Sequence, residues 1–332
     1  MKHGTLVSGA LVLALAACPV VPKAEEFRLQ PPLECEIDRD CWIVRYVDLD
    51  PGPGFVDHAC GQETSDDHKG TDFAIPHLAA MAAGKEVRAS APGRVKAVRD
   101  GMEDRNVMEI DPQEIAGREC GNGVVIEHEG NFETQYCHLR QGSVVVAPGD
   151  EVESGTVIGL VGLSGETSFP HVHLTLRHND ETVDPFRGLI EDTACEAGGA
   201  GLWDEAAAAT MRYNPIILRN AGFATGALDG DDIDEGRLDQ PPSSVTIPAL
   251  VFAFDGFYLK EGDVLETRIG GPGGWTHEHR ETVEASKASF MRFSGRKAPS
   301  GGFAPGTYEA SLEVSRAGKG VIARIERTVE LQ

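Results

Sequence analysis

The sequence has little positive charge, no long apolar run and, between Thr71 and Phe186, almost no helical periodicity. Its 332 residues include 30 Lys and Arg against 53 Asp and Glu, which gives a formal net charge of -23. A surface of this sign repels nucleic acid and anionic lipid head groups, so neither is expected as a partner of the folded protein. Charge says nothing about the fold, which has to come from the pattern of apolar residues and turns.

One apolar run occupies residues 11–17, after an early Lys2. It is too short to span a bilayer as a helix of the mature protein, and it is typical of an export signal over residues 1–17. The sequence Leu-Ala-Ala-Cys that ends at Cys18 resembles the lipobox of bacterial lipoproteins, in which the signal is removed before a cysteine that carries lipid. An ordinary signal cut after a small residue fits the same pattern. We expect an exported chain with a lipid anchor on Cys18.

The cysteines lack the Cys-x-x-Cys spacing of a thiolate metal site. Seven cysteines minus Cys18 leave six, and an even number in an exported chain predicts up to three disulfides. Sequence alone leaves the connectivity open, and the short loop from Cys35 to Cys41 is the one pairing that we favour. The other four are Cys60, Cys120, Cys137 and Cys195.

The first half of the chain has the short apolar runs, separated by Gly and Pro turns, that are typical of a β protein. Residues 18–34 are Pro-rich and charged, as in a tether between an anchor and a folded body, and residues 35–195 are expected to form the first domain. Ala-Pro-Gly recurs at residues 91–93 and 147–149, where Pro then Gly predicts a type II turn before a strand and hints at an internal duplication. The strand-like runs are residues 42–47, 95–98, 124–127 and 157–161.

The second half predicts a linker and a small β-sandwich. Residues 196–243 are expected to hold a short helix over residues 203–211 and a solvated acidic linker, whose run at 229–235 lacks calcium-loop spacing. Strand-like runs return over residues 244–332, which is typical of a β-sandwich. They are residues 245–247, 250–254, 264–269, 308–314 and 321–325. His277 and His279 have no third ligand beside them, so an exposed loop is expected there.

Two histidine motifs indicate a metal site. His68 and Asp72 stand four apart, and the glycine and β-branched residue before Asp72 favour a loop that enters a strand. His171 and His173 stand two apart, so on a strand they point to the same face. The imidazoles of His68 and His173 and the carboxylate of Asp72 match the three protein ligands of a catalytic zinc, whose fourth position holds water. We expect ordinary packed or surface roles for His58, His77, His128 and His178.

With Tyr-Cys-His-Leu at residues 136–139, these motifs resemble the lysostaphin-like (LytM-type) family of zinc endopeptidases, which cut the peptide cross-links of bacterial peptidoglycan. The family's His-x-Gly-x-Asp is matched at residues 68–72, its isolated His at His138 and its His-x-His at residues 171–173. The resemblance extends over roughly residues 60–187. It implies a mostly antiparallel β fold with an internal duplication, so the predicted fold class is mainly β, with an antiparallel metallopeptidase domain before the smaller sandwich.

The resemblance also assigns roles to individual residues. It implies that His68, Asp72 and His173 bind zinc (Zn2+), with His138 and His171 beside the metal-bound water as catalytic residues. Zinc lowers the pKa of bound water toward about 7 and polarises the scissile carbonyl. An unligated imidazole can take the proton of that water or donate to the developing oxyanion and leaving amine. Which of the two histidines does which stays open.

Two positions depart from the family's common pattern. Glycine commonly precedes the Pro-His pair and phenylalanine commonly follows the second His, whereas this chain has Phe169 and Leu174. Both positions border the cleft, so they bear on substrate fit more than on metal binding. Cys137, beside His138, is also a candidate to tie that strand by a disulfide.

Three functions follow as hypotheses. The first is a zinc endopeptidase that acts on peptidoglycan stems, with D,D cleavage between D-Ala and diaminopimelate in a Gram-negative host. Pro19 after Cys18 lacks the Asp that signals inner-membrane retention, so an outer-membrane anchor facing the periplasm is expected. The alternative is a catalytically silent scaffold or activator of a wall hydrolase. A D,D-carboxypeptidase of another zinc family would need a Glu just before the final His, where Pro170 and Val172 flank His171 instead.

Overall fold

The structure is a computed structural model that describes residues 1, 4, 26–190, 194–195 and 199–332. The expected export signal and Cys18 lie outside the described residues, as does most of the expected tether. No helix within the described part of the chain is long and apolar enough to cross a membrane. The protein is mainly β, which confirms the predicted fold class.

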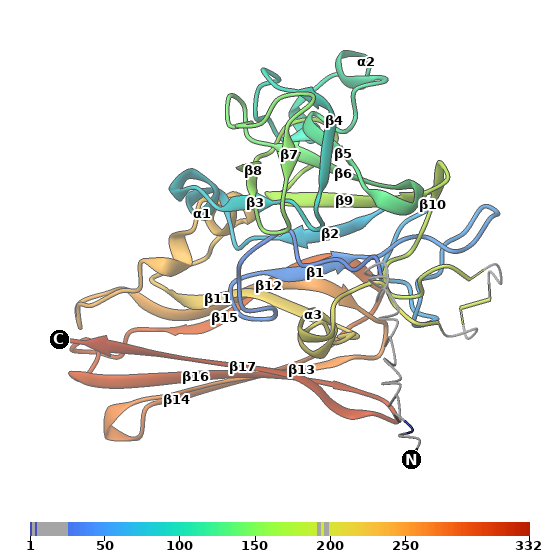
Figure 1. Ribbon diagram of the computed structural model, residues 1–332. Helices are drawn as coiled ribbons and strands as arrows, with labels where there is room; N and C mark the ends of the chain where they lie inside the picture. Colours follow the sequence, from blue (N-terminus) through green and yellow to red (C-terminus); the bar gives the residue numbers. More distant parts are fainter. Residues whose placement is uncertain (2–3, 5–25, 191–193, 196–198) are drawn as a thin grey trace.

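The first body of the molecule is built on one antiparallel sheet (Figure 1). A two-stranded sheet and the short helices α1 (Leu78–Ala83) and α2 (Pro112–Ile115) accompany it. In order across the large sheet, the strands are β1 (Trp42–Arg45), β2 (Thr71–Ala74), β9 (His171–His178), β6 (Phe132–Leu139), β5 (Asn122–Glu127), β4 (Gly93–Arg99) and β7 (Glu151–Val152), with β10 (Glu181–Thr182) on β9. The smaller sheet pairs β3 (Glu86–Arg88) with β8 (Val157–Leu160).

Apolar side chains from neighbouring strands form the core of this body. Phe73 on β2 and Val172 on β9 face each other in register, and both are fully buried together with Tyr136 on β6. The hydroxyl of Tyr136 accepts a hydrogen bond from the backbone N–H of Ser90, which compensates its burial. The sheet that carries the histidine motifs is therefore held rigid from inside.

The repeated Ala-Pro-Gly segments lead into two strands that pair with each other, β4 and β7. Gly149 has φ 101°, as a type II turn requires, but Gly93 does not lie in the positive-φ region, so the predicted turn is wrong there. A Cβ on Gly93 would lie 2.3 Å from the carbonyl oxygen of Glu127. Turn geometry explains the glycine at position 149, and close backbone approach explains the glycine at position 93.

The second body is a β-sandwich, drawn below the large sheet in Figure 1. Phe252 and Phe254 from one sheet share a buried core with Tyr308 and Leu312 from the other. The three-stranded sheet has the order β11 (Ile217–Ala224), β12 (Ala249–Leu259), β15 (Lys287–Lys297), and the four-stranded sheet has the order β14 (Thr276–Thr282), β13 (Val264–Gly270), β16 (Gly306–Arg316), β17 (Gly320–Leu331).

Two expectations about connecting segments are corrected. In the expected tether, Leu29 and Leu33 are buried in the core of the first body, so the described part of that segment belongs to the fold. The expected linker contains the predicted helix as α3 (Glu205–Thr210), but it also contains β11, an integral strand of the sandwich. Apolar burial in both segments outweighs their polar composition.

Three smaller expectations are also corrected. The acidic run forms the helix α4 (Gly230–Asp234), because Asp229 and Asp232 build a capping box and Ile233 is buried. Residues 245–247 form no strand, since a turn occupies residues 245–246. His277 and His279 lie on β14 and not in a loop, since register pairing with β13 continues through both.

An apolar cluster joins the two bodies. Its members come from β1 and β2 on one side and from β11 and β12 on the other, and all are buried. Two hydrogen bonds accompany it: the hydroxyl of Tyr258 donates to the carbonyl of Val44 at 2.5 Å, and the amide of Asn220 donates to the carbonyl of Pro76 at 2.9 Å. The edge of the sheet that carries the histidine motifs thus packs against the sandwich. The cluster consists of Trp42, Val44, Ala74, Ile217, Phe257 and Tyr258.

Six cysteines form three disulfides. The pairing of Cys35 with Cys41 is confirmed, and Cys137 is tied to Cys120 next to the histidine motif. The third bond joins Cys60 to Cys195, 135 residues apart in sequence. Its long closed loop makes it the largest constraint on the unfolded chain.

Removing a disulfide should destabilise the protein more when the loop that it closes is longer. Replacing both Cys60 and Cys195 by Ser should lower the free energy of unfolding by about 5 kcal/mol, and the same change at Cys35 and Cys41 by about 2 kcal/mol, because the separations are 135 and 6 residues. Urea unfolding under non-reducing conditions measures both. Equal losses in the two variants would show that loop closure does not determine the effect.

Candidate metal centre

Strand pairing brings the two histidine motifs together. Strands β2 and β9 are antiparallel neighbours in which Asp72 stands opposite His173. His68 lies in the loop that enters β2, as the sequence predicts, and His171 is two residues before His173 on β9. On the other side of β9, strand β6 carries His138. All five residues singled out from the sequence therefore lie at one place in the sheet.

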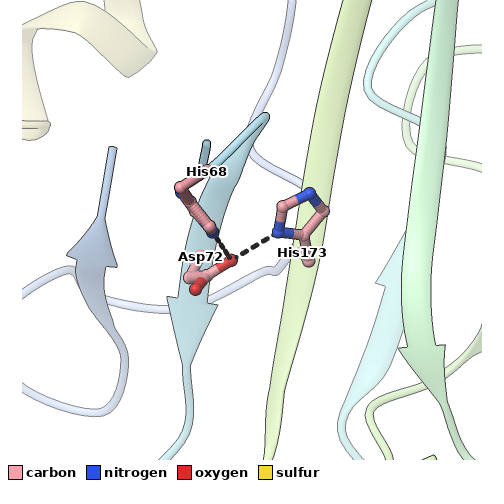
Figure 2. Close-up of side chains that lie close together, drawn as sticks. All are labelled: His68, Asp72 and His173. Carbon is pink, nitrogen blue, oxygen red and sulfur yellow. Dashed lines mark hydrogen bonds and ion pairs between the residues drawn. The ribbon is translucent and has the colours of Figure 1, made fainter. Parts of the chain in front are cut away.

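The carboxylate of Asp72 lies at the centre of the group (Figure 2). Its Oδ1 is 3.2 Å from Nε2 of His68 and 2.8 Å from Nδ1 of His173, as the dashed lines show. One ligand atom from each of the three residues lies within 4.8 Å of the other two. Within the described residues this is the one cluster of three or more His, Cys, Asp or Glu that could hold a metal ion.

In His68 and His173, the ring nitrogen that points away from Asp72 forms a hydrogen bond. This bond directs the other ring nitrogen toward Asp72. Nδ1 of His68 donates to the carbonyl oxygen of Tyr46 at 2.7 Å. In the matching tautomer of His173, Nε2 donates to the hydroxyl of Thr175 at 3.0 Å and Nδ1 keeps its lone pair. Partners of this kind fix the tautomer and ring orientation of metal-binding histidines.

This arrangement fits a zinc ion. Among the described residues, the buried Nε2 atom of His68 has no hydrogen-bond partner, although Asp72 is close by. An unprotonated nitrogen and a carboxylate oxygen both present lone pairs, so only a proton or a cation makes this contact favourable. Nitrogen and oxygen donors in a set of three are what catalytic zinc sites use.

Opposite charges shift the pKa values of the central pair. Burial favours the neutral form of Asp72, but the surrounding imidazoles, His68 foremost, outweigh it, so the pKa of this carboxyl is well below its usual value. Burial also lowers the pKa of His68, but Asp72 outweighs it and the pKa is raised. Asp72 is therefore an ionised ligand at neutral pH.

The other two histidines lie beside the group with one nitrogen each held by backbone. Nδ1 of His138 donates to the carbonyl of Ser164 at 2.8 Å, and its ring centroid is 4.7 Å from that of His171. Nδ1 of His171 is 3.0 Å from the carbonyl of Phe169, and its Nε2 is 3.6 Å from Oδ1 of Asp72. In each ring Nδ1 carries the proton, so Nε2 is left as the acceptor.

Burial keeps these two imidazoles neutral. It lowers the pKa of His138 well below its usual value, and the neighbouring His171 and His173 lower it further. It also lowers the pKa of His171, although Asp72 opposes this effect. A neutral imidazole in this position can accept a proton, which the ligand imidazoles cannot do once their lone pairs are bound.

Sequence reasoning missed the groups that orient the imidazoles. Thr175 had a signal, because it lies two residues after His173 and so shares its strand face. The carbonyls of Tyr46 and Ser164 had none, since any residue type can offer a backbone oxygen. The strained backbone of His138, with φ 63°, was equally invisible.

Comparison with known proteins then identifies this part of the chain. Residues 66–185 match the model of Peptidase family M23. These residues form an M23 peptidase domain. The resemblance to the lysostaphin-like family is thereby confirmed, and the M23 family is metal-dependent.

Curated relatives match over the same M23 domain. The DD-carboxypeptidase/endopeptidase Mpg of Neisseria meningitidis is 35% identical over 120 residues, 36% of this chain and 22% of that protein. The peptidoglycan DD-endopeptidase ShyA of Vibrio cholerae is 34% identical over 123 residues, 37% of this chain and 23% of that protein. The chain thus spans less than a quarter of the length of these relatives.

Among solved structures, the match to a mutant catalytic domain of the prophage-encoded M23 protein EnpA from Enterococcus faecalis has 27% identity and a TM-score of 0.30. It covers 43% of this chain and 88% of that chain.

Gly70 of the M23 domain should tolerate no side chain. A Cβ there would lie 2.4 Å from Nε2 of His173 and 2.7 Å from the carbonyl of Leu174. In Gly70→Ala the ring of His173 has to move, and because displacements of about 1 Å cost roughly 100-fold in rate, zinc affinity and turnover should both fall. Zinc titration measures the affinity directly. Gly226→Ala is the matched control, since its Cβ would meet nothing within 4 Å and its φ, like that of Gly70, is not positive; equal effects would contradict the explanation.

The buried carboxyl of Glu63, five residues before His68, should make the free energy of unfolding depend on pH. Burial raises the pKa of Glu63 from 4.5 to about 8, and Oε2 of this residue has no hydrogen-bond partner among the described residues. The folded state therefore holds a proton that the unfolded chain releases, so this carboxyl should reduce the free energy of unfolding as pH rises toward about 8, at up to roughly 1.4 kcal/mol per unit.

Glu63→Gln should remove that contribution. Its free energy of unfolding should rise relative to the wild type between about pH 4.5 and about pH 8, because over this range the unfolded wild type has lost the proton that Glu63 keeps in the folded state. Urea unfolding at several pH values measures the difference. Asp184, whose pKa burial raises to about 7, stays in both proteins, so the comparison isolates Glu63. A difference that is constant with pH would refute the assignment.

Proposed function

We propose that this chain is a zinc-dependent endopeptidase that hydrolyses peptide cross-links of bacterial peptidoglycan. The observation that carries the proposal is the group of His68, Asp72 and His173, whose donor atoms converge while hydrogen bonds hold the far side of both rings. The M23 match supports a peptidase. The names of two relatives, a DD-carboxypeptidase/endopeptidase and a peptidoglycan DD-endopeptidase, support the substrate class.

The proposed chemistry divides the five residues into two sets. His68, Asp72 and His173 would hold zinc, which supplies a Lewis acid that polarises the scissile carbonyl and makes water acidic. His138 and His171 stay outside this set because, among the described residues, the converging donor atoms come from His68, Asp72 and His173. The imidazole that accepts the proton of the attacking water through Nε2 becomes a donor at that atom, so it can stabilise the developing oxyanion and then return the proton to the leaving amine. Either His138 or His171 can take this role.

Within peptidoglycan, the bond proposed to be cleaved is the D,D cross-link between D-Ala and diaminopimelate. Analysis of muropeptide products distinguishes this from carboxypeptidase action, which the double name of the Neisseria relative makes the second candidate. An endopeptidase separates cross-linked dimers, whereas a carboxypeptidase releases terminal D-Ala and leaves the dimers intact.

The proposed location is the cell envelope, with an export signal over residues 1–17 and a lipid anchor on Cys18, at the periplasmic face of the outer membrane. Three disulfides support export, because such bonds persist in oxidising compartments. Peptidoglycan is met there, so an anchor would hold the enzyme beside its substrate.

A catalytically silent scaffold is the competing function. Such relatives usually lack metal ligands, whereas this chain keeps all three ligand positions and both neighbouring histidines. Metal analysis of the purified wild-type protein separates the two functions, since a scaffold needs neither zinc nor cleavage.

Replacing the two histidines of the His-x-His motif should have different effects on zinc content and activity. His173→Ala should lose zinc and activity together, because it removes a ligand. His171→Ala should keep zinc and lose roughly 100- to 10,000-fold in kcat, because it removes only proton transfer or oxyanion binding. Zinc content by mass spectrometry and cleavage of isolated muropeptides are the two measurements.

His178→Ala is the matched control, since this histidine lies on the same strand and packs against Phe132 away from the group. It should keep both zinc and activity. If His171→Ala also empties the site, the division of roles is wrong, and if the wild type binds no zinc, the enzyme itself is refuted.

A further inference from the structure

Phe169 touches His171 in two ways. Its ring stacks on the imidazole, with centroids 4.6 Å apart and planes 27° apart. Its carbonyl oxygen is 3.0 Å from Nδ1 of the same imidazole. Any residue at position 169 could supply the carbonyl, but only an aromatic one supplies the stacked face. The glycine that is common at this position in lysostaphin-like enzymes would leave that face bare.

The other contacts of Phe169 come from the sandwich. Its ring centroid is 5.4 Å from that of Phe257 on β12, and the guanidinium of Arg219 on β11 is 6.0 Å from it. The same guanidinium is 5.6 Å from the ring of Phe257. Aromatic pairs and a cation over an aromatic face attract each other at these separations. Phe169 thus lies between His171 and two side chains of the second body.

Arg219 is itself fixed in place. Its side chain is 6% exposed and forms ion pairs with Asp255 on the neighbouring strand and with Asp234 on α4. Burial lowers the pKa of this guanidinium, but the two carboxylates outweigh it and raise the pKa, so the group stays charged. A buried, paired guanidinium has little freedom to move. It presents a rigid cationic surface to the two phenyl rings.

His171 is held at its edge by hydrogen bonds and needs a second restraint on its plane. The acceptors at Nδ1 are the carbonyl of Phe169 and, at 3.1 Å, the hydroxyl of Thr167. Contacts at one nitrogen fix the tautomer but allow the ring to rock about that point. A stacked phenyl ring restrains this motion, and so it keeps Nε2 directed toward Asp72, 3.6 Å away.

We propose that Phe169 is a positioning residue for His171, and that Phe257 and Arg219 of the sandwich hold it in place. The C-terminal sandwich then sets the orientation of a catalytic imidazole, although it supplies no group to the reaction. The inference rests on the proposed function, because it concerns the proton chemistry assigned to His171. It gives the sandwich a role in turnover that is separate from substrate or wall binding.

The kinetic test uses the full chain loaded with zinc. Phe169→Leu keeps an apolar side chain and the backbone carbonyl but removes the ring, so kcat should fall roughly 10- to 100-fold while KM and zinc content stay unchanged. Phe169→Tyr should restore kcat, because it restores the stacked ring. Phe257→Leu should lower kcat severalfold, because Phe169 loses its support from the sandwich.

Ile217→Ala is the matched control for the interface. Ile217 is buried in the same apolar cluster but has no ring to stack on Phe169. It should lower thermal stability and leave kcat unchanged. If Ile217→Ala and Phe169→Leu lower kcat equally, the interface acts only through stability and the positioning role is overturned. An unchanged kcat in Phe257→Leu would overturn the part assigned to the sandwich.

A second readout does not depend on activity. In proton NMR spectra, the carbon-bound ring protons of His171 should be shifted upfield by the stacked phenyl ring, and they are assigned by their loss in His171→Ala. These signals should move downfield in Phe169→Leu and stay in place in Phe169→Tyr, with and without zinc. Unmoved signals would overturn the inference. If the wild type cleaves no muropeptide, the proposed function fails, and the spectra alone decide whether Phe169 holds the ring.

Discussion

The antiparallel pairing of β2 with β9 is the constraint on which the rest of the site depends. It places Asp72 opposite His173, 101 residues later in sequence. Successive side chains on a strand point to opposite faces, so a slip of one residue would move Phe73 and Val172 out of the core and the ligands into it. Burial of these apolar side chains therefore fixes the register, and the register places the ligands.

A buried carboxylate is costly unless its surroundings compensate it. Around Asp72 the compensation comes from imidazoles on three sides, which are oriented in turn by the carbonyl of Tyr46 and the hydroxyl of Thr175. Gly70 leaves the room that His173 occupies. The same contacts that compensate the buried carboxylate also bring together a donor set that could hold a metal ion.

The apolar cluster that joins the two bodies of the protein is accompanied by the ion pairs of Arg219 in the sandwich. Strand β1 and the segment before His171 both pack against the sandwich, and Arg219 with its two carboxylates stiffens the sandwich side. Position 169 carries an aromatic ring, Phe169. The ring fills space between the bodies and reaches the imidazole at the same time.

The sequence by itself determined the mainly β class, the short Cys35 to Cys41 loop and the set of five residues at the site. Local signals carry most of these: alternation of apolar residues, close spacing of cysteines, and histidines two or four residues from a partner. His138 was placed at the site by the resemblance to the lysostaphin-like family. Tertiary structure alone decided the pairing of Cys60 with Cys195, the place of β11 in the sandwich, and the carbonyls of Tyr46 and Ser164 that orient two imidazoles. The physical reason is that backbone oxygens are common to every residue type, and contacts between distant segments form only when the whole core packs.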